Sequence, residues 1–82
     1  MKRLYFESGK TIIREGENST DAFFIESGEV RILKGEKEIG TLKENAIFGE
    51  HGCIGHKPRT ATVVALTPLI LRVLKEEDFY QV

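Results

Sequence analysis

The sequence predicts an all-β fold of the jelly-roll type, also described as a double-stranded β-helix or β-roll. Two observations carry this prediction. Short stretches rich in β-branched and aromatic residues follow one another along the chain, and glycine-containing turns separate them at roughly regular spacing. With 82 residues, the chain has room for a single domain spanning residues 1–82 and one modest core.

The expected strands alternate with turns in chain order. A turn at 15–18 follows the first strand, and turns at 27–29 and 34–37 lie on either side of the third. Pro68 ends the fifth strand, because proline cannot donate a ladder hydrogen bond. The strands are expected at 11–14, 22–26, 30–34, 38–42, 60–66 and 69–74.

Helical structure is expected only at two fringes of this β framework. Residues 49–54 have room for one helical turn. Residues 75–80 look like the start of a helix, because Glu76, Glu77 and Asp78 lie where the helix dipole favours negative charge.

Composition excludes several classes of function. The net charge of −1 gives no general attraction to nucleic acid or to an anionic membrane, so we expect neither as a partner. No apolar run approaches the ~20 residues of a membrane helix. One cysteine, Cys53, rules out an internal disulfide and fits a reducing cytoplasm, which is the expected location. No nucleophile–base–acid set is visible, so we expect no catalytic residues and no enzyme.

Two runs predict a binding site for a small anion that also carries hydroxyl groups. Gly49 permits close backbone approach, and the Glu50 carboxylate accepts from a hydroxyl. The planar fork of Arg59 suits phosphate, and the Thr60 hydroxyl beside it is an extra donor. The runs are Phe48-Gly49-Glu50 and, after seven intervening residues, Pro58-Arg59-Thr60-Ala61-Thr62-Val63.

Each of these residues also has a simpler interpretation. Glu50 alone would be a solvated turn carboxylate, and Arg59 alone a surface arginine on an edge strand. Gly49 and a helix start with free backbone N–H groups favour a binding role instead. Without ligand, we expect Arg59 and Glu50 to form an ion pair. If Arg59 points into the cavity, strand alternation turns Thr60 away unless the strand is bulged.

A second motif suggests a metal, but it is incomplete. His51, Cys53 and His56 supply three transition-metal ligands in a His-x-Cys-x-x-His spacing, whereas a structural zinc site uses four. The chain has no further Cys or His, so we expect no metal site. A cupin-like metal enzyme using His51 and His56 is the second alternative to a sensor of small molecules.

The two runs resemble the phosphate-binding cassette of cyclic nucleotide-binding domains. These domains occur in regulatory subunits of cyclic-nucleotide-dependent kinases, in cyclic-nucleotide-gated channels, and in bacterial regulators like the catabolite activator protein. Residues 12–17 and 21–30 are similar to the family's opening strands and glycine turns, so the resemblance spans about residues 6–80. It implies a regulatory module that binds a cyclic mononucleotide, cAMP ahead of cGMP, and needs no cofactor.

The resemblance also implies a role for each motif residue. Glu50 would accept from the ribose 2′-hydroxyl, and Gly49 would let backbone approach the sugar. Arg59 would pair with the cyclic phosphate, with Thr60 beside it. The backbone N–H groups around Gly52 and Cys53 would face that phosphate, and Val63 and the Ile47 region would contact the base. The implied ligand-binding set is Phe48, Gly49, Glu50, Gly52, Cys53, Arg59, Thr60 and Val63.

The chain departs from the family pattern in two places. The family usually has Leu-Ala-Leu where this chain has His51-Gly52-Cys53, which removes an apolar anchor and adds backbone freedom. A degenerate member that binds another anion, or acts through protein contacts, is therefore the first alternative. The family's long capping helix would only be starting at Val82, so we expect a stand-alone sensor or an excised domain. A homodimer or an effector domain is its expected partner.

Overall fold

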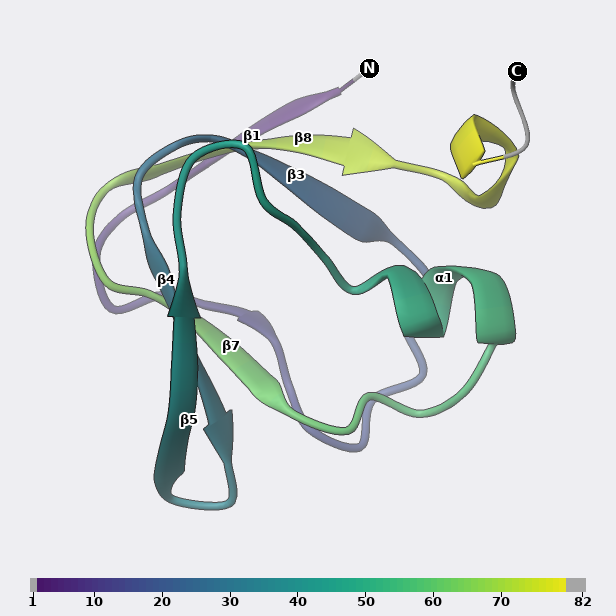
Figure 1. The fold of residues 1–82 in the computed structure, drawn as a ribbon, viewed down its shortest axis with the longest axis horizontal. Helices are drawn as coiled ribbons and strands as arrows, with labels where there is room; N and C mark the ends of the chain where they lie inside the picture. The colour runs from purple at the N-terminus through teal and green to yellow at the C-terminus, as the bar shows by residue number, and fades with distance from the viewer. Residues whose placement is uncertain (1, 80–82) are drawn as a thin grey trace.

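The computed structural model describes residues 2–79 and shows two antiparallel sheets of four strands each, with the core between them (Figure 1). This arrangement confirms the predicted β-roll. No helix in the described part of the chain is long and apolar enough to cross a membrane. The molecule measures 35 × 25 × 16 Å along its principal axes.

The first sheet has the strand order β1-β8-β3-β6. Its strands are β1 (Arg3–Phe6), β8 (Leu69–Leu74), β3 (Ala22–Ser27) and β6 (Ile47–Phe48). Strands β1 and β6, at the two edges of this sheet, were not expected from the sequence. Strand β1 alternates between exposed and half-buried positions and depends on β8 for its pairing, and β6 has only two residues, too few for a pattern.

The second sheet has the strand order β2-β7-β4-β5. Its strands are β2 (Thr11–Ile13), β7 (Thr62–Ala65), β4 (Val30–Lys34) and β5 (Lys37–Leu42). Only β4 and β5 are neighbours both in sequence and in a sheet. Every other connection carries the chain from one sheet to the other, as a jelly roll requires.

The core fills the space between the two sheets. Strand β8 places Leu69, Leu71 and Val73 inward at alternate positions, each at most 6% exposed. Phe23 and Phe48 pair across β3 and β6 with ring centroids 5.3 Å apart. Both sheets supply the cluster, which consists of Ile13, Phe23, Ile25, Val30, Phe48, Val63, Ala65, Leu69, Leu71 and Val73.

A smaller apolar cluster attaches the two helical elements to one end of the first sheet. Helix α1 (Glu50–Gly55) and the 3-10 helix η1 (Glu76–Phe79) both lie at this end (Figure 1). Cys53 packs with Ala22 and Leu74, and Phe24 and Phe79 pack against them. Both helical turns were expected, and the expectation for residue 80 lies outside the described residues.

Gly28 is the point at which the chain passes from β3 into β4 in the other sheet. Its φ is +102°, and an added Cβ would lie 2.4 Å from the backbone oxygen of Pro68. The turn expected at 27–29 is therefore a crossover that only glycine fits.

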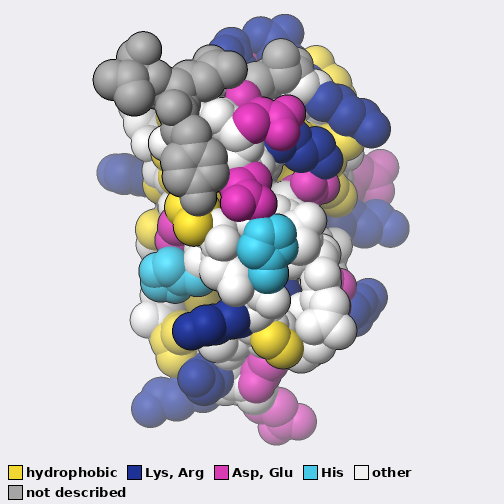
Figure 2. Space-filling model, turned by 90° about the vertical axis from the view of Figure 1, so that its right-hand side faces the viewer, with side chains coloured by type: hydrophobic (Ala, Val, Ile, Leu, Met, Phe, Trp, Pro, Cys, Tyr) yellow, Lys and Arg dark blue, Asp and Glu magenta, His cyan; other side chains and the backbone are white. Residues whose placement is uncertain are grey.

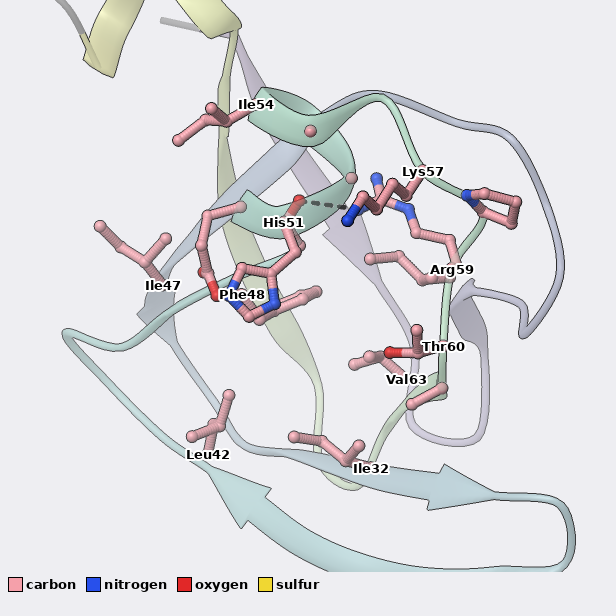
Figure 3. A pocket seen from close by; sticks show the side chains of 17 residues that line it. Ile32, Leu42, Ile47, Phe48, His51, Ile54, Lys57, Arg59, Thr60 and Val63 are labelled. Carbon is pink, nitrogen blue, oxygen red and sulfur yellow. Dashed lines mark hydrogen bonds between the residues drawn. The ribbon is translucent and has the colours of Figure 1, made fainter.

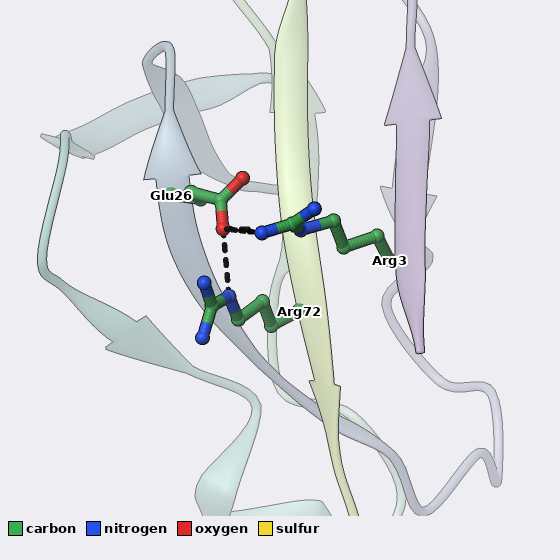
Figure 4. Close-up of polar contacts among 3 residues, drawn as sticks. All are labelled: Arg3, Glu26 and Arg72. Carbon is green, nitrogen blue, oxygen red and sulfur yellow. Dashed lines mark hydrogen bonds and ion pairs between the residues drawn. The ribbon is translucent and has the colours of Figure 1, made fainter. Parts of the chain in front are cut away.

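Glu26 joins three strands on the outer face of the first sheet. Its Oε1 accepts from Arg72 Nε at 2.7 Å and from Arg3 Nε at 3.2 Å (Figure 4). The hydrogen bond from Arg72, and then the charge of Arg3, hold the pKa of Glu26 below its ordinary value against the effect of desolvation.

Candidate functional site

A cavity of about 880 Å³ opens beside α1 (Figure 3). One wall is apolar and comes from three strands of the two sheets, with Ile32, Leu42 and Ile47 as its main side chains. The opposite wall comes from the 57–60 segment, including Arg59 and Thr60. The cavity therefore combines an apolar surface with a polar one.

The structure brings nearly all of the predicted site residues to this cavity. Those that line it are Phe48, Gly49, Glu50, Gly52, Arg59, Thr60 and Val63. Segments far apart in the sequence meet here because β6 and α1 lead into the cavity from one sheet and the 57–60 segment leads out into β7 of the other. Their role in binding stays a prediction.

Cys53 is the exception, because it does not line this cavity, and its expected phosphate contact stays a prediction. Its side chain is fully buried, and its backbone N–H donates to the carbonyl of Gly49 at 3.1 Å. Burial raises the pKa of its thiol. The reason is position: Cys53 lies on the face of α1 that packs on the first sheet, away from the cavity.

Arg59 lines the cavity, but its guanidinium lies beneath α1 rather than in open solvent. It is 6% exposed, and all three guanidinium nitrogens donate to protein oxygens. Nη1 donates to the Gly49 carbonyl at 2.7 Å, Nε to Ser19 Oγ at 3.0 Å, and Nη2 to the Asp21 carbonyl. The sequence motif did not point to Ser19 or Asp21, since neither lies near Arg59 in the chain.

The expected ion pair between Arg59 and Glu50 is absent from the ion pairs of residues 2–79. The guanidinium instead donates to the carbonyls of Gly49 and Asp21 and to the Ser19 hydroxyl. The expectation of a surface arginine on an edge strand is also wrong. Arg59 precedes β7, and its own backbone pairs with the 16–17 turn, through Gly16 N to Arg59 O at 2.7 Å and Arg59 N to Glu17 O at 2.9 Å.

Thr60 faces the cavity together with Arg59. Strand alternation had suggested that the two point in opposite directions, but β7 begins only at Thr62, so alternation does not apply to them. Thr60 is exposed and lines the cavity. Thr62 has a structural contact instead, since its Oγ1 accepts from the Glu15 N–H at 3.0 Å.

Gly49 needs the backbone freedom of glycine. It caps α1 with φ +83°, in the left-handed region, and an added Cβ would lie 3.1 Å from Arg59 Nη1 and from the Asp21 carbonyl. Glycine at this position therefore permits the left-handed backbone at the start of α1 and leaves room for Arg59.

The two histidines do not form a metal centre with their neighbours. His51 lines the cavity, whereas His56 ends α1 and lies 2.8 Å from Glu76 through its Nε2. They appear as two separate cyan patches on the face of Figure 2. Among residues 2–79, no group of three or more His, Cys, Asp or Glu side chains is placed to hold a metal ion.

Asp21 connects the arginine to Lys75, the residue that precedes η1. Its backbone carbonyl accepts from Arg59, and its Oδ1 accepts from Lys75 Nζ at 2.6 Å. The hydrogen bond to Asp21 raises the pKa of Lys75. Together with the His56–Glu76 contact, this places two polar links between the cavity region and the last described turn.

Comparison with known proteins gives the family. The family model described as "Cyclic nucleotide-binding domain" matches residues 3–82. The chain therefore belongs to the cyclic nucleotide-binding domain family, as the resemblance of its cassette suggested.

The relatives include eukaryotic kinases and a bacterial regulator. A cGMP-dependent protein kinase of Eimeria tenella is 42% identical over 82 residues, 99% of this chain and 8% of that protein. A cAMP-dependent protein kinase regulatory subunit of Mucor circinelloides f. lusitanicus is 35% identical over 96% of this chain and 19% of that protein. The structure of the Thermus thermophilus catabolite activator protein superposes with a TM-score of 0.87 at 27% identity, over 96% of this chain and 39% of that one.

Proposed function

We propose that this chain is a regulatory module that binds a cyclic mononucleotide and has no catalytic activity of its own. One observation carries the proposal: Glu50, Arg59 and Thr60 line a single cavity whose other wall is apolar. A cyclic nucleotide has matching parts, namely a charged phosphate, a ribose hydroxyl and a flat, largely apolar base.

Each part of such a ligand finds a suitable group. The Arg59 guanidinium, with the Thr60 hydroxyl beside it, offers donors to the phosphate. The Glu50 carboxylate accepts from the ribose 2′-hydroxyl. Ile32, Leu42, Ile47 and Val63 offer apolar surface to the base. This assignment keeps the predicted roles of all these residues.

Which base the site prefers, adenine or guanine, is a more specific proposal. The sequence favoured cAMP, and that preference stays a prediction. One observation favours cGMP as the second candidate: the exposed Thr60 hydroxyl lines the cavity and can accept from the 2-amino group of guanine. Relatives named as cGMP-dependent kinases reach 42–47% identity, which points the same way.

The test is isothermal titration with cAMP and cGMP, with 5′-AMP and 5′-GMP as open-chain controls. We expect about micromolar affinity, near −8 kcal/mol, for one cyclic nucleotide. Glu50→Gln keeps the side-chain shape but weakens the acceptor, and should lower affinity about tenfold; Arg59→Lys removes the fork and should lower it further. Glu38→Gln, remote on β5, is the matched control.

No heat from either cyclic nucleotide would overturn the proposal and favour the degenerate sensor. The chain covers only a small part of its relatives, so regulation of a linked or associated effector domain is proposed on family grounds. A homodimer and a cytoplasmic location are proposed on the same grounds as in the sequence analysis.

A further inference from the structure

Gly52 lies directly against the guanidinium of Arg59. An added Cβ at Gly52 would be 2.4 Å from Arg59 Nη1, 2.8 Å from Cζ and 3.2 Å from Cδ. Cβ atoms do not approach other atoms this closely, so any larger residue forces the arginine to move. The position is helical, so the backbone itself accepts alanine.

Because Gly52 has no side chain, the Arg59 guanidinium occupies this space in a withdrawn position. The arginine is 6% exposed there, and Nε, Nη1 and Nη2 each donate to a protein oxygen. A guanidinium has five N–H donors, so three are already committed before a ligand arrives. Two N–H donors are left for an anion, on a side chain that is only 6% exposed.

Two of the three oxygens that accept from Arg59 also have another hydrogen-bond partner. The Gly49 carbonyl still accepts from the Cys53 N–H at 3.1 Å, and Ser19 Oγ still donates to Glu17 Oε1 at 2.9 Å. Two of the three acceptors therefore keep a partner when the arginine moves, and the penalty of an unpaired buried oxygen is largely avoided.

We propose that Gly52 is a positioning residue that holds Arg59 withdrawn beneath α1, so that an anionic ligand must draw the arginine into the cavity. The ligand part of this inference rests on the proposed function, whereas the position of Arg59 does not. When the binding-competent state of a protein is only partly populated, its apparent affinity for the ligand falls by that fraction. Glycine at position 52 thus lowers the affinity of the site.

The first experiment measures the exchange of the Arg59 Nε–H with water by NMR in the ligand-free chain. We expect slow exchange in the wild type and at least tenfold faster exchange in Gly52→Ala, whose methyl group displaces the guanidinium. Gly55→Ala is the matched control, because it adds the same methyl to the same helix, 3.8 Å from Lys57 Cγ and away from Arg59. Slow exchange in Gly52→Ala would overturn the proposal.

The second experiment titrates cAMP and cGMP into the same three proteins. Gly52→Ala should bind about tenfold more tightly than the wild type, after subtraction of any gain that Gly55→Ala shows from helix propensity alone. Equal or weaker binding, with Arg59 already released, would overturn the affinity claim. If no form binds either nucleotide, the proposed function fails, and the exchange rates still decide the role of Gly52.

Ser19→Ala covers the case in which Gly52→Ala does not fold. It removes the acceptor of Arg59 Nε on an exposed loop and leaves α1 unchanged. Faster exchange and tighter binding in Ser19→Ala support a withdrawn arginine that limits affinity. Faster exchange with weaker binding shows that the withdrawn position is the binding-competent one, and overturns the proposal.

Discussion

At the scale of single residues, two members of the predicted site have opposite surroundings. Arg59 is the one buried charged side chain among the described residues, and three protein oxygens compensate its burial. Cys53, six positions earlier, is buried among apolar side chains. Helix α1 separates them, because one of its faces meets the cavity and the other meets the first sheet.

The thiol of Cys53 should resist modification in the folded chain. It is fully buried, and burial raises its pKa, so both access and the thiolate fraction are low. We expect reaction with a thiol reagent such as DTNB at pH 8 to be at least a hundredfold slower in the native protein than in urea. A native rate near the unfolded rate would show that α1 does not stay on the sheet.

At the scale of elements, the charge cluster on the outer face ties β1 and β3 to β8. Strand β1 is short and lies at a sheet edge, with β8 as its one neighbour. The shared carboxylate of Glu26 gives it a second attachment through Arg3, while Arg72 orients the carboxylate from β8 (Figure 4).

This cluster makes the stability of the folded chain depend on pH in the acidic range. The pKa of Glu26 in the folded chain is below its ordinary value of 4.5, so its stabilisation is complete above about pH 4.5 and is lost as pH falls through the lower folded value. Glu26→Gln should therefore flatten the decline of the melting temperature below pH 4.5. Because the Arg72 hydrogen bond is the largest cause, Arg72→Gln should flatten it more than Arg3→Gln does. Equal acid sensitivity in all four proteins would contradict this account.

At the scale of the whole molecule, the fold depends on places where the chain changes sheets. At the Gly28 crossover the space for a side chain is filled by backbone, because an added Cβ would lie 2.4 Å from the Pro68 carbonyl oxygen. Gly16 has a similar φ of +88°, but an added Cβ there meets nothing within 4 Å.

These two glycines give a matched test. Gly16→Ala should cost about 1–2 kcal/mol from the left-handed backbone alone. Gly28→Ala adds a clash with the Pro68 carbonyl that requires the β7–β8 connection to move, and should cost about 3 kcal/mol or more. Urea denaturation of both variants measures the difference. Equal losses of unfolding free energy in the two variants would mean that the segment around Pro68 moves at little cost.

The sequence predicted the strands with strong β-branched patterns and missed those that depend on their partners. Strand β8 carries its own alternation of buried positions, whereas β6 exists because Phe48 pairs with Phe23. At the site, the motif predicted seven residues that line the cavity, but it also included Cys53, which does not line it, and it missed Ile32 and Leu42. It did not predict the oxygens that hold Arg59, because Ser19 and Asp21 reach it only through the fold of a distant turn.

The connectivity of the two sheets has a consequence for how the chain folds. Only the β4–β5 hairpin can form from residues that are close in sequence, and β1 must meet β8 across nearly the full chain length. Closing such long loops costs entropy before any contact repays it, so folding is dominated by non-local pairing. The chain should acquire its structure in milliseconds to seconds, as is typical of such topologies, and a fragment lacking the last strand would leave β1 and β3 without their common neighbour.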